Sequence, residues 1–290
     1  MPDMQELLCM SAQDMLALVQ SRQALAVDDD QHLPKAQMVA ADPPWEYENF
    51  GLKKHGAARG HYPGRSVPDV AGDLGWAMDV AALDAYLVVW CTFPKLEEWM
   101  LFGSPAIREC RPKAKPNDQR GWRYVSGGAW AKINGLGPGY HWRGDCEPAL
   151  LYTKGSPLPR TEASNLWMAP RVGHSEKPQL ALRRQVCMCT DPGGLVIDLY
   201  AGASASLARA CRAVGRRYIG AEIDPERHAQ ALQAYGAQEL EMEVWPLERA
   251  KGPAMAKALV PTEASSGKEV GWAEVETKPR RKGIRRRDGL

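Results

Sequence analysis

The chain has 290 residues, of which 44% are hydrophobic, and this length fits one large domain or two small ones. Its 7 cysteines form no CxxC pair, which favours reduced thiols over a disulfide framework or a metal site. No signal peptide or membrane-spanning apolar run is evident, so we expect a soluble, cytoplasmic protein. The net charge of +2 conceals a strongly basic stretch, "KPRRKGIRRRDGL".

The predicted elements alternate between strands and helices along the chain. Residues 1–34 are predicted to form a helical segment, because Leu and Met recur at helical spacing over 4–26. Apolar runs predict strands over 35–42, 83–92, 127–133 and 146–155. Helical patterns cover 93–103, which Gly103 should end, and also 177–190 and 225–236. Residues 192–224 have the pattern of a strand, a tight glycine turn, a helix and a second strand.

This alternation predicts an α/β fold with a Rossmann-like, doubly wound and mainly parallel sheet. The domain should cover 35–248, and its basic, aliphatic-poor insertion at about 104–145 should contact a target. Residues 249–290 are predicted to be a linker and basic tail, mostly disordered. Ligands of such sheets bind beyond the carboxyl ends of the strands, so Asp42 and Asp198, which both end strands, should face one crevice.

The stretch "ADPPW" places an acid, two prolines and a tryptophan directly after a buried strand. Two prolines fix a stiff, extended turn. Such a turn suits methylation of an exocyclic amine, because that amine needs two acceptors for its N–H groups. Asp42 supplies a carboxylate oxygen and Pro43 a main-chain carbonyl. Trp45 is expected to offer a flat face for stacking a base and for a sulfonium cation.

The stretch "VIDLYAGASASLARA" predicts a strand, a turn and a helix that hold a nucleotide-type cofactor. Glu222 ends the next strand, where a carboxylate can bind ribose hydroxyls. Gly202 alone remains of the glycines that a pyrophosphate would need, and Asp198 and Glu222 would repel one. S-adenosylmethionine fits better, because it has a ribose and an ammonium but no phosphate.

With these motifs, the chain resembles the S-adenosylmethionine-dependent amino-methyltransferases that modify N6 of adenine. "DPPW" at 42–45 is similar to their catalytic motif, and "DLYAGAS" at 198–204 to their cofactor turn, with Ser204 where a second glycine is usual. The catalytic motif precedes the cofactor motif, as in the circularly permuted beta class. The N-terminal half resembles the branch of the messenger-RNA adenosine methyltransferase catalytic subunit, many of whose phage and bacterial members modify DNA.

The resemblance implies a class I methyltransferase fold and a set of site residues. The catalytic residues would be Asp42, Pro43, Pro44 and Trp45. The cofactor contacts would be Asp198, Tyr200, Gly202, Ser204, Glu222 and Asp224, with Ser175 and Lys177 of "HSEKPQ" on the methionine carboxylate. Contacts to the target strand would come from His55, Arg59, His61, Tyr62, His141, Trp142 and Arg143.

The implied partners are a nucleic acid, with DNA ahead of RNA, no membrane, and a second copy of the chain as a homodimer. The implied location is the cytoplasm of a bacterial or phage-infected cell. Four alternatives stay open: methylation of adenine in RNA, methylation of cytosine N4, a non-catalytic nucleic-acid-binding subunit, and a nicotinamide-dependent oxidoreductase. The intact Asp42, Trp45, Asp198 and Glu222 disfavour the non-catalytic subunit. The missing phosphate glycines disfavour the oxidoreductase.

Overall fold

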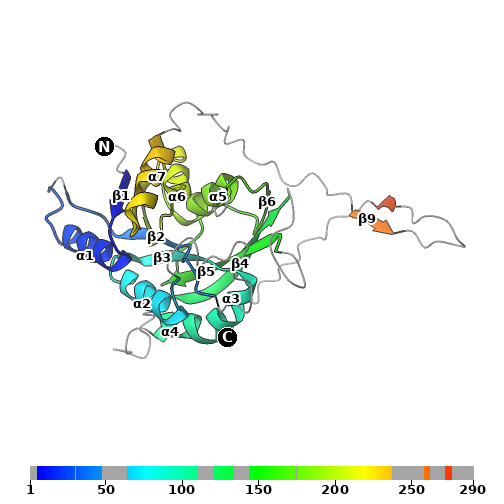
Figure 1. Ribbon diagram of the computed structural model, residues 1–290, viewed down its shortest axis with the longest axis horizontal. Coiled ribbons are helices and arrows are strands. Elements are labelled where there is room, and N and C mark those ends of the chain that lie inside the picture. Colours follow the sequence, from blue (N-terminus) through cyan, green and yellow to red (C-terminus); the bar gives the residue numbers. More distant parts are fainter. Residues whose placement is uncertain are drawn as a thin grey trace, which may run out of the picture. The chain divides into compact units, whose positions relative to one another are not determined.

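The computed structural model describes residues 5–29, 31–47, 64–109, 121–133, 144–173 and 176–236, and the backbone of two strands at 258–261 and 272–275. The chain divides into two units, Met1–Met242 and Glu243–Leu290. The first unit, drawn in blue to yellow in Figure 1, contains the sheet and its helices.

The first unit is built on an 8-stranded sheet in the order β1-β8-β7-β2-β3-β5-β4-β6. Its strands are β1 Gln5–Cys9, β2 Ala36–Ala41, β3 Ala81–Trp90, β4 Arg123–Lys132, β5 Cys146–Lys154, β6 Leu166–Ala169, β7 Leu195–Asp198 and β8 Arg217–Glu222. Of these eight, β5 alone runs against the others, since it pairs antiparallel with both β3 and β4. The expected mainly parallel sheet is confirmed.

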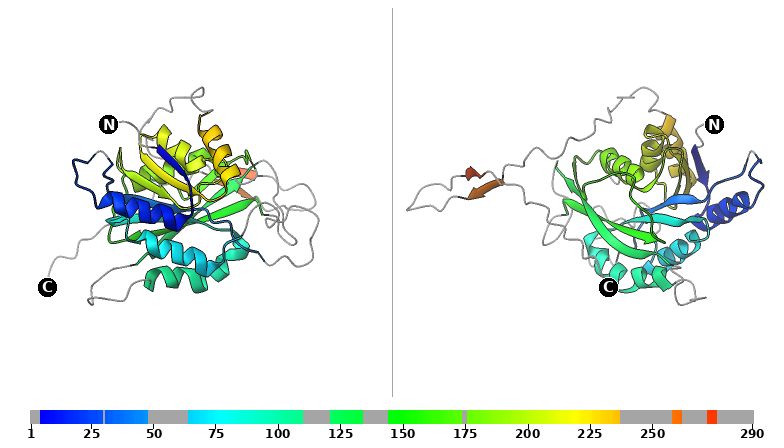
Figure 2. Two further views of the ribbon diagram at one scale, coloured as in Figure 1. Left: turned by 60° about the vertical axis from the view of Figure 1, so that its left-hand side comes forward. Right: turned by 180° about the vertical axis from the view of Figure 1, so that it is seen from behind.

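Helices cover both faces of this sheet, as the views in Figure 2 show. One face carries α1 Ala12–Gln23, α2 Val67–Ala77, α3 Phe93–Glu98, the π-helical turn η2 Trp99–Gly103 and α4 Ser104–Glu109. The other face carries α5 Gln179–Cys189, α6 Ser206–Ala213 and α7 Pro225–Gly236. Two apolar cores result, and the predicted Rossmann-like α/β class is confirmed.

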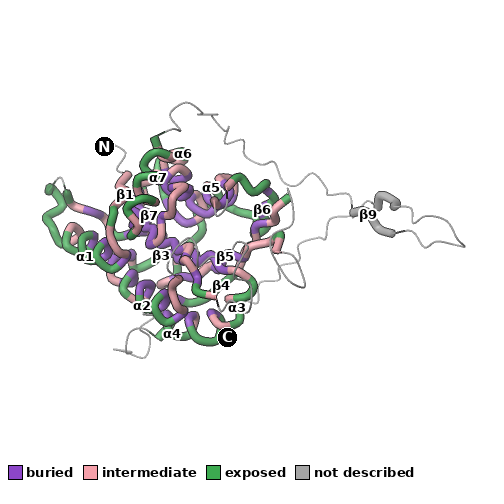
Figure 3. The backbone as a smooth tube through the Cα atoms, viewed as in Figure 1, coloured by how far each residue is buried: buried purple, intermediate pink, exposed green. Residues whose placement is uncertain are grey.

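The central strands are mostly apolar because both of their faces are covered. In β3, Leu87 and Val89 belong to one core, and Val88 and Trp90 to the other. Figure 3 shows these central strands as buried segments between partly exposed helices. This burial explains why the run around Val88 predicted its strand so clearly. No described helix has the length and apolar character needed to span a membrane.

The helix predicted over 4–26 is wrong in its first part. Residues Gln5–Cys9 form β1, which pairs in parallel with β8 at the edge of the sheet. The helix α1 begins only after Ser11, whose hydroxyl accepts the N–H of Asp14 as an N-cap. Because β1 completes the sheet and α1 contributes Met15 to its core, residues 5–29 lie within the main unit.

The helix that Gly103 should have ended continues through η2 into α4. Gly103 has another function here, since a Cβ on it would lie 2.2 Å from the ring of Trp99. The predicted insertion at about 104–145 contains α4 and β4, which are parts of the main fold. Its stretches 110–120 and 134–143 lie outside the described residues.

The second unit contains an antiparallel strand pair in the range predicted to be a linker and tail. Its strands are β9 Ala258–Pro261 and β10 Trp272–Val275. The basic stretch beyond residue 277 lies outside the described residues.

Candidate active site

The "DPPW" stretch leaves the carboxyl end of β2 as a turn fixed by its own main chain. The carbonyl of Pro43 accepts the N–H of Trp45 at 2.8 Å, which closes a three-residue turn around Pro44. The Pro44 carbonyl accepts the N–H of Arg65 at 2.7 Å, and the Arg65 carbonyl accepts the N–H of Glu46 at 3.0 Å. The turn is therefore held both internally and by the segment before α2.

The structure corrects the expectation that Trp45 offers an open face for stacking. Its side chain is 4% exposed, and its indole N–H donates to the Trp90 carbonyl at 3.1 Å. The ring packs edge-on against Trp99, with centroids 5.5 Å apart. Because the following backbone is pinned to Arg65, the apolar ring turns inward, and Trp45 anchors the turn in the core.

Asp42 belongs to a chain of alternating charges at the edge of the sheet. Lys177 lies 2.6 Å from Asp42 Oδ2 and 3.3 Å from Glu147 Oε2. Glu147 also binds Lys132, which ends β4. The ammonium of Lys177 lies 5.4 Å from the centroid of the Trp90 ring, in the geometry of a cation–π contact.

The surroundings shift the pKa values of this group in different directions. Burial raises the pKa of Asp42, although the cation of Lys177 opposes this shift. Burial also acts to raise the pKa of Glu147, but Lys177 and Lys132 outweigh it, so the pKa of Glu147 is lowered. Burial alone would lower the pKa of Lys177, yet the two carboxylates raise it. Lys177 therefore stays a cation, and it favours the ionised form of Asp42.

Lys177 has two carboxylate partners that the resemblance did not imply. It is 8% exposed, and its ammonium binds the carboxylates of Asp42 and Glu147. Its expected contact with the methionine carboxylate stays a prediction. Ser175, its expected companion, lies outside the described residues.

The cofactor motif forms a turn directly beside the catalytic one. Asp198 ends β7, in register with Ala40 two residues before Asp42. Gly202 has φ +66°, a left-handed conformation that glycine adopts at little cost, and a Cβ there would meet nothing within 4 Å. Its N–H donates to Glu222 Oε2 at 3.1 Å. Asp42, Asp198 and Glu222 therefore all lie at the carboxyl ends of their strands, as the sequence predicted.

Asp198 is a buried carboxyl that is only 5% exposed. It accepts the hydroxyl of Tyr218 at 3.0 Å and the N–H of Tyr200 at 3.3 Å. Within the described part of the chain, no lysine or arginine forms an ion pair with Asp198. Burial raises the pKa of Asp198 to about 7, and the negative charges of Asp42 and Glu222 add to the shift. A cationic ligand group would relieve this destabilised charge.

Two residues of the cofactor motif have local structural partners. Asp224 caps α7, because its Oδ1 accepts the N–H groups of Glu226 and Arg227 at 2.9 and 3.1 Å. The Ser204 hydroxyl pairs with that of Ser206 at 2.6 Å, at the start of α6. The seven residues expected to contact the target strand, in 55–62 and 141–143, lie outside the described residues.

Sequence reasoning missed four residues that lie in or beside the candidate site: Arg65, Asp73, Lys132 and Glu147. Glu147 is an acid that opens the apolar run "PALLY", and Asp73 lies on the buried stripe of α2 beside Val70 and Leu74. An acid inside an apolar stripe is uncommon unless paired, and this was the available signal.

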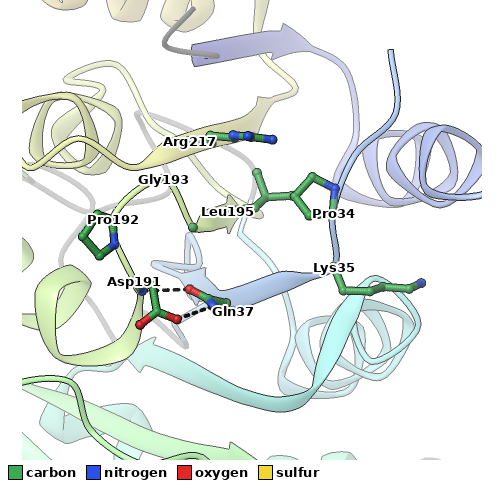
Figure 4. Close-up of a pocket in the computed structure, with 9 residues that line it drawn as sticks. Pro34, Lys35, Gln37, Asp191, Pro192, Gly193, Leu195 and Arg217 are labelled. Carbon is green, nitrogen blue, oxygen red and sulfur yellow. Dashed lines mark hydrogen bonds between the residues drawn. The ribbon is translucent and has the colours of Figure 1, made fainter. Parts of the chain in front are cut away.

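A hollow of about 260 Å³ lies at the opposite edge of the sheet, beside the amino ends of β2, β7 and β8. Figure 4 shows Gln37 and Asp191 joined by two hydrogen bonds, of 2.7 and 2.9 Å, with Lys35 and Arg217 around them. Because ligands of open α/β sheets bind beyond the carboxyl ends, this hollow is separate from the candidate site.

Comparisons with known proteins show two sequence matches, both to DNA methyltransferases. Residues 152–233 match the N6_N4_Mtase family model, described as DNA methylase. A stretch of 107 residues is 32% identical to the DNA adenine methyltransferase YhdJ of Escherichia coli (strain K12). That match covers 31% of this chain and 36% of YhdJ, so the chain spans about a third of this relative's length.

Solved structures of methyltransferases share the fold. The M1.HpyAVI–SAM complex superposes with a TM-score of 0.55 at 15% identity, covering 79% of this chain and 98% of that one. TTHA0409 of Thermus thermophilus, a putative DNA modification methylase complexed with S-adenosyl-L-methionine, gives a TM-score of 0.54 at 16% identity. It covers 80% of this chain and 93% of that one. At these identities the likeness establishes the fold.

Proposed function

We propose that this protein transfers a methyl group from S-adenosylmethionine to the N6 amine of adenine in DNA. The observation that carries the proposal is the pair of neighbouring strand ends. β2 delivers Asp42 and a rigid Pro43 carbonyl, and β7 delivers the glycine turn with Asp198. The matches to the DNA methylase family model and to YhdJ support this reaction and DNA as its substrate.

The residues at the end of β7 and β8 fit S-adenosylmethionine better than a dinucleotide. Asp198 is buried, and none of the described residues pairs a cation with it, so it suits the ammonium of the methionine part. Glu222 lies within hydrogen-bonding distance of the Gly202 N–H and so faces the turn, where it suits ribose hydroxyls. This cofactor supplies a methyl group already activated on a sulfonium.

The catalytic turn suits an amine acceptor. Lys177 binds Asp42 Oδ2, which leaves Oδ1 as the oxygen that would accept one amine N–H. The Pro43 carbonyl has a second lone pair beyond the one used by Trp45, and this would accept the other N–H. In this way the amine is drawn toward tetrahedral geometry, and positioning supplies most of the catalysis. Trp45 and Pro44 hold the turn in place.

The finer features of the proposal follow the resemblance. The catalytic motif at 42–45 precedes the cofactor motif at 198–204, which is the permuted, beta-class order. The branch of the messenger-RNA methyltransferase, a phage or bacterial origin and a homodimer are further parts of the proposal. The target strand would be contacted by His55, Arg59, His61, Tyr62, His141, Trp142 and Arg143.

The decisive experiment incubates the protein with tritiated S-adenosylmethionine and with DNA and RNA separately, followed by nucleoside mass spectrometry. We expect N6-methyladenine in DNA. We expect Asp42→Ala to lower the transfer rate by about 1,000-fold or more, because an orienting acceptor is lost, while cofactor affinity stays within about threefold. N4-methylcytosine or methylated RNA as the main product would replace the substrate proposal, and a fully active Asp42→Ala variant would refute the assigned chemistry.

A further inference from the structure

Asp73 is a buried carboxylate that neither sequence motif contains. It lies in α2, is 1% exposed, and receives hydrogen bonds from three separate parts of the chain. Gln13 of α1 donates to Oδ1 at 3.0 Å, and the Tyr200 hydroxyl donates to Oδ2 at 2.6 Å. The guanidinium of Arg65 also binds Oδ2. A buried carboxylate is costly unless it is paired, and these donors pair it.

Arg65 extends this network to the catalytic turn through its own main chain. Its N–H holds the Pro44 carbonyl and its carbonyl holds the Glu46 N–H, while its side chain binds Asp73. A continuous path therefore runs from Pro44 through Arg65 and Asp73 to Tyr200.

At the other end, Tyr200 belongs to the cofactor turn. Its N–H donates to Asp198, two residues earlier, and its hydroxyl donates to Asp73. Burial raises the pKa of Tyr200, as does the negative charge of Asp73, so the hydroxyl keeps its proton and remains a donor.

We infer that Asp73 is a positioning residue that fixes the cofactor turn at 198–202 relative to the catalytic turn at 42–45. The inference rests on the proposed function. The ladder between β2 and β7 aligns the two strands only as far as Ala40 and Asp198. Beyond the strand ends, both turns are loop segments, and methyl transfer needs their ligands in line at about 3–3.5 Å. A misplacement of about 1 Å can cost about 100-fold in rate.

The test compares Asp73→Asn with Tyr200→Phe, each a near-isosteric change that cuts the same connection. The side-chain NH₂ of an asparagine would face at least one of the groups that donate to Asp73, so that hydrogen bond is lost. A phenylalanine at position 200 lacks the hydroxyl that donates to Asp73. For each variant we expect the single-turnover rate on DNA, expressed per cofactor-binding site, to fall about 10- to 100-fold. Cofactor affinity should change by less than about threefold for Asp73→Asn. The double variant should lose little more than either single one, because both remove one link.

Asp191→Asn is the control for the loss of an acid that accepts from a glutamine and an arginine. Asp191 also accepts from a glutamine, Gln37, and from an arginine, Arg160, but it lies at the opposite edge of the sheet. Its variant should keep the wild-type rate. A purely structural Asp73 would instead lower the melting temperature and the number of binding sites without changing the rate per site.

Amide hydrogen exchange provides a readout that does not need activity. In the cofactor-free protein, exchange at the N–H groups of Glu46 and Arg65 should rise in both Asp73→Asn and Tyr200→Phe, but not in Asp191→Asn. The inference is overturned if exchange there is unchanged, if Asp73→Asn turns over at the wild-type rate, or if the two losses simply multiply. A wild-type protein that methylates neither DNA nor RNA would refute the proposed function alone, since the exchange result still decides the link.

Discussion

Asp42 and Asp198 end neighbouring strands of one sheet, yet their electrostatic surroundings are opposite. Asp42 has the ammonium of Lys177 at 2.6 Å, and Lys177 in turn is shared with Glu147. Asp198 is more deeply buried and receives only a tyrosine hydroxyl and a backbone N–H from the described residues. The first acid carries its counter-charge within the protein, whereas the described residues provide none for the second.

This difference fits the two tasks proposed for the turns. An acid that must accept an amine N–H has to be ionised before the substrate arrives, so a permanent cation beside it is useful. An acid that must bind a cationic ligand gains affinity if its charge is unsatisfied beforehand, because the ligand then relieves the cost of burial. The comparison predicts that removing charge at one turn should affect the rate, and at the other the affinity.

At the catalytic turn, replacing Lys177 should have the largest effect after the loss of Asp42 itself. In Lys177→Gln the cation that opposes the raised pKa of Asp42 is lost, so this pKa should rise further. The protonated carboxyl is a poorer acceptor, and the acid limb of the rate–pH profile should move to higher pH. Near pH 7 we expect a loss of about 10- to 100-fold, partly recovered by pH 9. Single-turnover rates between pH 5 and 9 measure this shift.

Lys132→Gln is the control for this change, because Lys132 binds Glu147 and only weakly influences Asp42. Its acid limb should move much less. Equal shifts in the two variants would mean that the net charge of the cluster sets the pKa of Asp42, and that its direct contact with Lys177 does not.

The sequence predicted the central strands, and the acids Asp42 and Asp198 at their ends, because these signals are local. The apolar runs of β2, β3 and β7 follow from burial on both faces. "DPPW" directly follows β2, and "DLYAG" begins at the last residue of β7. By contrast, β1 is short and pairs with β8 more than 200 positions away, so its strand character depends on a distant neighbour.

The remaining site residues depend on contacts that no sequence window contains. Trp45 is a residue type that often stacks on bases. Its inward position depends instead on its hydrogen bond to the Trp90 carbonyl and its ring contact with Trp99. Glu147 becomes a site residue only because Lys177 reaches it from the segment before α5. Glycine is typical of helix ends, but Gly103 lies inside the helical segment, where its lack of a side chain leaves room for the ring of Trp99.

Cofactor binding should release a proton at the second turn. The pKa of Asp198 is raised to about 7 in the free protein, and a bound ammonium should lower it. Affinity for S-adenosylmethionine should therefore tighten by about tenfold as the pH rises from 5.5 to 7, with up to one proton released near pH 6. Calorimetry in buffers of different ionisation enthalpy measures both quantities. Asp198→Asn should bind more weakly and show a nearly flat profile, and a wild-type profile as flat as this would contradict the absence of a counter-charge at Asp198.

The stability of the cofactor-free protein should also depend on the ionisation of Asp198. Because the folded-state pKa of Asp198 lies above the value of about 3.9 in an unfolded chain, the folded state binds more protons between these values. Its contribution to the free energy of unfolding therefore falls as the pH rises from about 4 to 7, by about 4 kcal/mol at most. Asp198→Asn should raise the melting temperature at pH 8 and change it little at pH 4, which calorimetric or fluorescence melts can follow. A variant that is less stable than the wild type at pH 8 would mean that the hydrogen bonds from Tyr218 and Tyr200 outweigh the cost of burying this charge.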